Sequence, residues 1–215
     1  MQADKYTIAW FKIAECVSRG EKERALGVYR LLSHSFNDDA VARQLEADIY
    51  YACNEQEKAV ELYRQTVDLY DKSQRFLEAT AVLEHLVMLV PNDKVLRYDL
   101  INYYGYLRNI SKVGDVFTEV LLRMQGSNNH AAQIEKLVSL CAKAPDNACH
   151  IKMLEQLIIR LHRLDQYAAH MLPCLEQVLD ICMQDGYEEC IQEFFATIHA
   201  LDEDMYHYAC AYVKK

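Results

Sequence analysis

Two stretches of the sequence decide the fold: GEKERALGVY at residues 20–29 and NEQEKAVELY at residues 54–63. They align without a gap, so Ala25 matches Ala59 and Tyr29 matches Tyr63, with 34 positions between the members of each pair. Two helices of about 14 residues and two tight turns fill such a period. One helix pair cannot bury its apolar face alone, so the copies are expected to stack.

A second frame of the same period starts 20 residues later. Ala79 and Val113 are 34 positions apart, as are Leu83 and Phe117. A small residue such as Ala79 is expected where two helices cross closely, because a larger side chain would push them apart. We interpret the offset to mean that one helix is the second of one repeat and the first of the next.

These residues resemble the tetratricopeptide repeat (TPR) family. The frames that carry the resemblance are 6–39, 40–73, 60–93 and 94–127, the third through Phe76, Ala79, Leu83 and Pro91. Departures are Lys12 and Glu46, where the family has Leu. The resemblance implies an all-α fold, a right-handed superhelix of antiparallel helix pairs. It covers residues 6–127 well and becomes degenerate beyond them.

Apolar periodicity predicts about twelve helices. Their expected ranges are 4–18, 21–35, 38–53, 55–72, 75–89, 92–107, 110–125, 129–143, 147–163, 166–184, 187–200 and 203–213. The run Gly126-Ser127-Asn128-Asn129 resembles a loop and is expected to separate regular repeats in 1–126 from a degenerate helical half in 127–215, within one continuous solenoid.

Composition excludes several classes of function. The 215 residues carry 23 Lys and Arg against 32 Asp and Glu, a net charge of −9, which disfavours binding to nucleic acid or to anionic membranes. With 52% hydrophobic residues and only 6 Gly and 3 Pro, the chain is not expected to be disordered or all-β. No signal peptide opens it and no apolar run is long enough to span a bilayer. We therefore expect a cytoplasmic protein whose 8 Cys are free and mostly buried.

Motifs for chemistry are missing from the sequence. Cys174, Cys182 and Cys190 are eight residues apart, a spacing at which core residues of a helix also recur, and neither Cys-x-x-Cys nor His-Glu-x-x-His occurs. A nucleophile elbow and a Gly-rich phosphate loop are also missing. Paired carboxylates such as Asp38-Asp39 fall at expected helix starts, where they favour capping. The sequence thus predicts no enzyme, no metal and no cofactor.

The resemblance implies a binding groove lined by the first helix of each repeat. Carried over by register, the expected partner-binding residues are Trp10, Gln44, Asp48, Tyr51, Arg64, Asp68, Tyr98, Asn102 and Tyr106. The aromatic members are the anchor type of protein interfaces, although packing between repeats is an equal explanation for Tyr51 and Tyr106. A carboxylate clamp, as some family members have, is not expected, because Trp10 and Glu61 replace the lysines it needs.

The function predicted from these features is a non-catalytic scaffold that holds a peptide or helix of a partner protein. The acidic middle of the groove favours a ligand with basic residues flanked by apolar ones. Two alternatives stay open: a chaperone-like holder of a secreted or assembling client, and a self-associating homo-oligomeric subunit of a larger complex. The chain is also open to being a piece of a longer protein.

Overall fold

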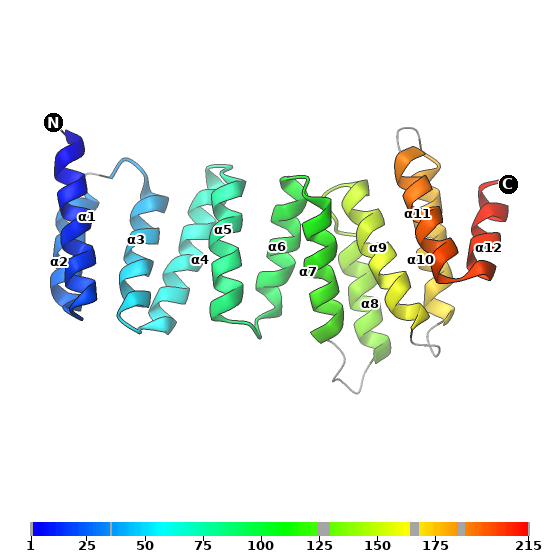
Figure 1. Ribbon diagram of the computed structural model, residues 1–215, viewed down its shortest axis with the longest axis horizontal. Helices are drawn as coiled ribbons and strands as arrows, with labels where there is room; N and C mark the ends of the chain where they lie inside the picture. Colours follow the sequence, from blue (N-terminus) through cyan, green and yellow to red (C-terminus); the bar gives the residue numbers. More distant parts are fainter. Residues whose placement is uncertain (1, 35, 124–129, 164–167, 185–187, 215) are drawn as a thin grey trace. The chain divides into compact units, whose positions relative to one another are not determined.

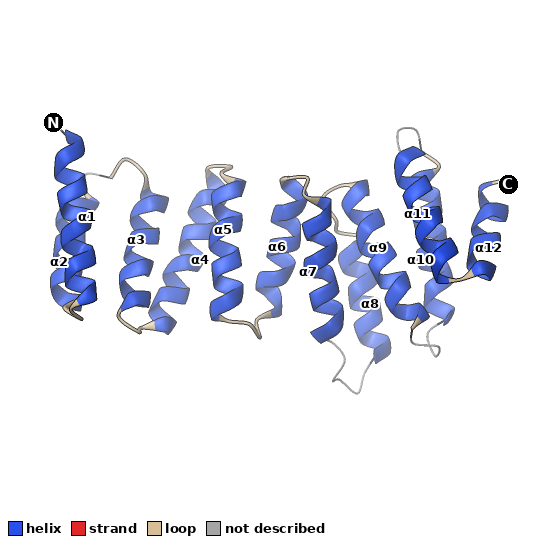
Figure 2. Cartoon of the chain, viewed as in Figure 1, coloured by secondary structure: helices blue, strands red, loops and turns tan. Residues whose placement is uncertain are grey.

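The computed structural model describes residues 2–34, 36–123, 130–163, 168–184 and 188–214. Within these ranges the regular structure is twelve α-helices joined by turns and loops (Figures 1 and 2). They are α1 (Gln2–Ser18), α2 (Lys22–Ser33), α3 (Asp39–Ala52), α4 (Gln56–Lys72), α5 (Phe76–Leu89), α6 (Lys94–Tyr106), α7 (Ile110–Arg123), α8 (His130–Cys141), α9 (Asn147–His162), α10 (Ala168–Cys182), α11 (Glu188–Leu201) and α12 (Glu203–Val213). The predicted all-α class is confirmed.

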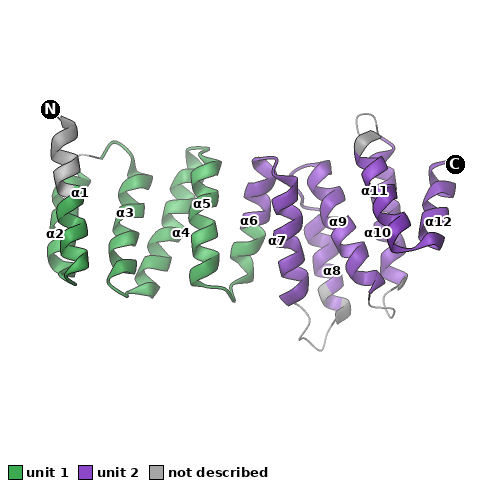
Figure 3. Ribbon diagram, viewed as in Figure 1, with its two compact units in different colours: residues 1–99 green, residues 100–215 purple. Residues whose placement is uncertain are grey.

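The chain forms two compact units, Met1–Asp99 and Leu100–Lys215, with the division inside α6 (Figure 3). The change of character expected from the sequence was placed later, at 126–129, and these residues lie outside those described. In the first unit α1 packs on α2, α2 on α3, and α4 on both α3 and α5. Helices therefore pack in consecutive pairs, and α4 has a partner on each side.

The same tight turn recurs at four places with the spacing of the repeats. Gly20, Asn54, Gln74 and Arg108 all have positive φ, between 55° and 71°. After each helix two backbone bonds close the turn, for example Gly20 N–H to Val17 O at 2.9 Å and Glu21 N–H to Cys16 O at 2.8 Å. This is the Schellman arrangement. Positions 20 and 54, and 74 and 108, are 34 apart, so the turns carry both frames of the sequence period.

Gly20 and Gly27 form a matched pair for testing the turn. A Cβ added at either position meets nothing within 4 Å, so only backbone conformation differs between them. We expect Gly20→Ala to cost about 1 kcal/mol because φ is +71°. Gly27→Ala, inside α2, should instead stabilise by about 0.5–1 kcal/mol. Urea denaturation of both variants checks this, and equal shifts of the midpoint in one direction would contradict it.

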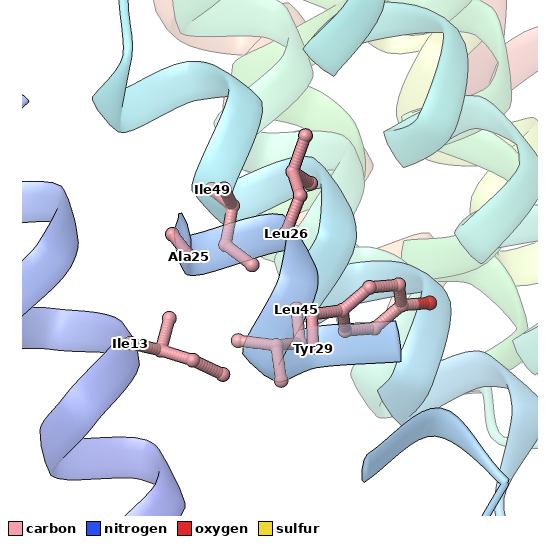
Figure 4. Packing of buried hydrophobic residues seen from close by; sticks show 6 residues of the cluster. All are labelled: Ile13, Ala25, Leu26, Tyr29, Leu45 and Ile49. Carbon is pink, nitrogen blue, oxygen red and sulfur yellow. The ribbon is translucent and has the colours of Figure 1, made fainter. Parts of the chain in front are cut away.

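The core of the first helix pairs shows why the alanine of the repeat is small. Ala25 is fully buried, between Ile13 of α1 and Leu45 and Ile49 of α3 (Figure 4). Its counterpart Ala59 in α4 is also fully buried. The predicted small positions are therefore in the core.

The second unit is built around α9 and α10. Helix α9 packs on α7, α8, α10 and α11, and α12 packs on α10 and α11. Large apolar side chains such as Phe117, Leu157 and Phe194 are almost completely buried. Gly105 fits a close approach there, because a Cβ would lie 2.1 Å from Pro145 Cγ. This unit thus has a dense core of its own, although its repeats are hard to see in the sequence.

Aspartates cap three helices. Asp38 Oδ1 accepts from Ala40 N–H at 3.0 Å and Val41 N–H at 3.2 Å. Asp146 and Asp202 each accept from the backbone three residues later, at 2.8 Å in both cases. Capping therefore accounts for Asp38 and Asp202 among the paired carboxylates. Helix α10 continues through Pro173 without a restart, since a proline near a helix start removes one hydrogen bond without ending the helix.

Candidate protein-binding surface

Four side chains of the first unit form a connected group, which we name the Tyr51 cluster: Asp48, Tyr51, Tyr63 and His85. The rings of Tyr51 and His85 meet edge to face with 5.2 Å between centroids. The rings of His85 and Tyr63 do the same at 5.0 Å. The Tyr63 hydroxyl donates to Asp48 Oδ1 at 2.5 Å. Three helices, α3, α4 and α5, thus supply one aromatic and acidic patch.

The repeat itself places these side chains together. Tyr51 and His85 are 34 residues apart, so they occupy equivalent positions at the ends of α3 and α5. Asp48 precedes Tyr51 by three residues, which puts both on one face of α3. Tyr63 of α4 is buried and holds the other two elements from below, whereas Tyr51 is 44% exposed. The cluster therefore has a fixed base and an accessible edge.

The Asp48 carboxylate carries an uncompensated charge. Burial raises its pKa above the ordinary value, and the hydrogen bond from Tyr63 and the nearby His85 offset this only in part. Although the residue as a whole is exposed, its carboxylate is thus less well solvated than a free aspartate. No Lys or Arg lies within salt-bridge distance of it in the described part of the chain. A raised carboxylate pKa means that ionised Asp48 opposes folding at neutral pH.

Asp48→Asn should therefore not destabilise the protein at pH 7. The unfolded state releases the proton of Asp48 at lower pH than the folded state, so the cost of Asp48 is full above its raised pKa and vanishes below its ordinary value. We expect the variant to be at least as stable as the parent at pH 7, with the difference shrinking as pH falls. Urea denaturation as a function of pH measures this.

Asp38→Asn is the matched control with the opposite sign. Burial of Asp38 acts to raise its pKa but is outweighed by hydrogen bonds from Val41 N–H and Arg75, so the pKa is lowered. Its contribution is present above the ordinary pKa and is lost as pH falls through the lowered one. Asp38→Asn should therefore destabilise at pH 7. A loss of stability in Asp48→Asn as large as that in Asp38→Asn would contradict the account.

The other predicted groove residues of α3 and α4 have different surroundings. Gln44 is half-buried, and its Oε1 accepts from the Tyr70 hydroxyl at 2.8 Å, one turn from the Asp48 bond. Arg64 binds Asp93 between Nη2 and Oδ2 at 2.6 Å, at the turn between α5 and α6. Asp68 is exposed on α4. The structure thus joins Asp48 and Tyr51 in one cluster, while Arg64 is engaged elsewhere.

The remaining predicted residues lie outside the Tyr51 cluster. Trp10 is 43% exposed on α1. Tyr98 is half-buried on α6, and burial raises the pKa of its hydroxyl. Asn102 and Tyr106 belong to the second unit, where Tyr106 meets Tyr103 edge to face at 6.0 Å between centroids.

The cysteines are poorly suited to nucleophilic chemistry. Cys141, Cys149, Cys174 and Cys182 are buried, and the other four are half-buried. Burial raises the pKa of the Cys174 and Cys182 thiols to about 11 and that of Cys149 to about 12. A nucleophilic cysteine needs the opposite shift. Within the described residues no three His, Cys, Asp or Glu side chains gather as metal ligands.

Two members of the cluster were missed in the sequence. His85 was passed over because the third repeat was counted from residue 60, which drew attention to Arg64 and Asp68. Counting 34 residues on from Tyr51 would have found it. Tyr63 was assigned to the repeat pattern alone, and its hydroxyl bond to Asp48 depends on a side-chain direction that spacing does not give.

Comparison with known proteins adds a weak structural similarity. No family model matches the chain, and neither does any curated protein. Among solved structures, a kinesin light chain of Podospora anserina with nearly identical TPR-like repeats matches with a TM-score of 0.30 and 15% identity, covering 92% of this chain and 94% of that one. In the part of the chain that the structure describes, each helix is too short or too polar to cross a bilayer. By its recurring turns and consecutive helix pairs, the chain is an all-α, TPR-like repeat protein.

Proposed function

We propose that the protein is a non-catalytic scaffold whose first unit binds a peptide or a helix of a partner protein across α3 and α5. TPR-like repeats generally mediate interactions between proteins, since stacked helix pairs present long open surfaces. The observation that carries the proposal is the Tyr51 cluster, which combines an exposed aromatic ring with an unpaired carboxylate. Partly exposed tyrosines on a rigid base are typical anchors of protein interfaces.

Apolar side chains next to the cluster extend the surface. Leu77, Ala81 and Met88 are exposed on α5, at spacings that place them on the same side of the helix as His85. Leu77 is 68% exposed and Met88 71%. Met is an adaptable side chain that suits varied ligands. An acidic and aromatic centre with apolar neighbours fits a ligand that alternates basic and apolar residues.

Peptide selection tests the proposal directly. A displayed library of random peptides about 12 residues long is selected on the wild-type protein, and the affinity of enriched peptides is measured by fluorescence anisotropy. We expect Tyr51→Ala to weaken binding at least about tenfold, because a buried aromatic anchor contributes more than about 1.4 kcal/mol.

Leu31→Ala is the control for this test. Leu31 is 82% exposed on α2, in the same unit but outside the Tyr51 cluster, and its loss should change affinity less than about twofold. Failure to enrich any peptide, or equal affinity for wild type and Tyr51→Ala, would show that α3 and α5 are not the binding surface.

A further inference from the structure

We infer that the Tyr51 cluster recognises the guanidinium group of an arginine in the partner, bound between the Asp48 carboxylate and the Tyr51 ring. This inference rests on the proposed function, because it specifies the ligand chemistry of the same surface. Four observations carry it: the charge of Asp48, its free hydrogen-bonding capacity, the exposed ring of Tyr51, and an equivalent arrangement elsewhere in the unit.

Asp48 differs from the other carboxylates of its unit. Glu46 binds Arg43 at 2.8 Å, Glu61 binds Lys58 at 2.7 Å and Asp93 binds Arg64 at 2.6 Å. Asp38 and Glu55 are paired with Arg75 and Lys22. Across the residues that the structure describes, Asp48 has a hydrogen bond from a neutral tyrosine and no cation within 4 Å. Its charge is therefore available to an incoming cation.

The hydrogen-bonding capacity of Asp48 is only partly used. An ionised carboxylate offers about four acceptor positions on two oxygens. The Tyr63 hydroxyl occupies one of them on Oδ1 and also fixes the direction of the carboxylate. The other positions can accept N–H groups from a ligand without moving any side chain of the cluster.

The first unit already contains an arginine held in the proposed way. The guanidinium carbon of Arg75 lies 4.6 Å from the centroid of the Tyr70 ring. The same guanidinium binds the carboxylates of Asp38 and Glu78. Arg75 is thus bound by a tyrosine ring and by acidic side chains together. Tyr51 and Asp48 offer these two elements, one turn apart on α3, without an arginine.

Arginine fits this site better than other charged side chains. Its planar group stacks on an aromatic ring and can donate several hydrogen bonds to a carboxylate at the same time. A lysine ammonium is more strongly hydrated and matches only the charge. An anionic ligand would meet Asp48 with repulsion. The ring of Tyr51 adds a cation–π attraction at a partly exposed site.

A titration with a small probe tests the inference without any knowledge of the partner. The probe is N-acetyl-arginine N-methylamide, and its neutral isostere N-acetyl-citrulline N-methylamide is the control. Binding is followed by NMR through the ring signals of Tyr51 and His85. We expect the arginine probe to bind wild type at least about fivefold more tightly than the citrulline probe, in proportion to charge and cation–π attraction.

Two variants locate the effect. Asp48→Asn keeps an acceptor for the Tyr63 hydroxyl and removes the charge, so the preference for the arginine probe should disappear. Glu61→Gln is the control on α4, since Glu61 already binds Lys58 and lies outside the cluster. It should leave the preference unchanged. Equal binding of both probes by wild type, or an unchanged preference in Asp48→Asn, would overturn the inference.

The selected peptides separate this inference from the proposed function. Replacing arginine by citrulline in them should weaken binding to wild type at least about tenfold. Peptides that bind through Tyr51 but lose nothing on this replacement would refute arginine recognition and leave the scaffold function standing. A preference for the arginine probe at Tyr51 and His85, without any enriched peptide, would refute the proposed peptide binding and support the chemistry of the site.

Discussion

Phe117→Ala is expected to lower the free energy of unfolding of the second unit by about 3–5 kcal/mol. Phe117 lies in α7 and is completely buried, and α7 packs on α9, the helix with the most neighbours in that unit. Removing its ring takes away buried apolar surface and leaves a cavity that the surrounding Leu and Ile side chains can fill only in part. The loss approaches the whole stability of many domains of this size.

The two units make this prediction more specific. In repeat proteins, stability is close to a sum over neighbouring elements, so damage to α7 should be felt mainly in Leu100–Lys215. Urea denaturation combined with hydrogen exchange measures the loss in each unit. Phe11→Ala is the control, since Phe11 is 72% exposed and its removal should change stability by less than about 0.5 kcal/mol. Similar losses in both variants would contradict the described core.

Ala59→Leu should destabilise the first unit by about 1–3 kcal/mol or more. Ala59 is completely buried in α4, at the position equivalent to Ala25, where the second helix of a pair lies closest to its neighbours. Three additional carbon atoms cannot be accommodated there without shifting α3 or α5, because both helices pack on α4. Thermal and urea denaturation measure the effect.

Ala14→Leu provides the comparison for Ala59→Leu. Ala14 is exposed in the middle of α1, and leucine is nearly as good a helix former as alanine. This change should alter the free energy of unfolding by less than about 0.5 kcal/mol. If Ala59→Leu were as harmless as Ala14→Leu, the close helix crossing that defines the repeat would not exist.

Much of the fold follows from the sequence because the repeat period is written into its backbone. The alignment of Ala25 with Ala59 predicts equivalent helices, and positive φ at Gly20, Asn54, Gln74 and Arg108 shows that the turns obey the same spacing. Three of these four turn residues are not glycine, so composition alone would not have identified them. In the second unit the helices follow the apolar periodicity, while the repeats themselves are not evident.

The candidate site is less predictable than the fold. The register of α3 correctly places Asp48 and Tyr51 on one face, because helical geometry alone decides it. The neighbours on other helices depend on which frame is counted across α4, and α4 packs on both sides. For this reason His85 was missed, and Arg64 was expected in the groove although it binds Asp93. Whether a charge is paired is a property of the folded chain and not of the spacing.

The claim that a partner's cation binds at Asp48 is tested most directly by a double-mutant cycle. Calorimetry measures the affinity of a selected peptide and of its arginine-to-citrulline form for the wild type and for Asp48→Asn. The account predicts a coupling energy of at least about 1 kcal/mol between the two changes, since each removes one side of the same contact. Additive effects, with a coupling energy near zero, would contradict it and place the peptide's arginine elsewhere on the protein.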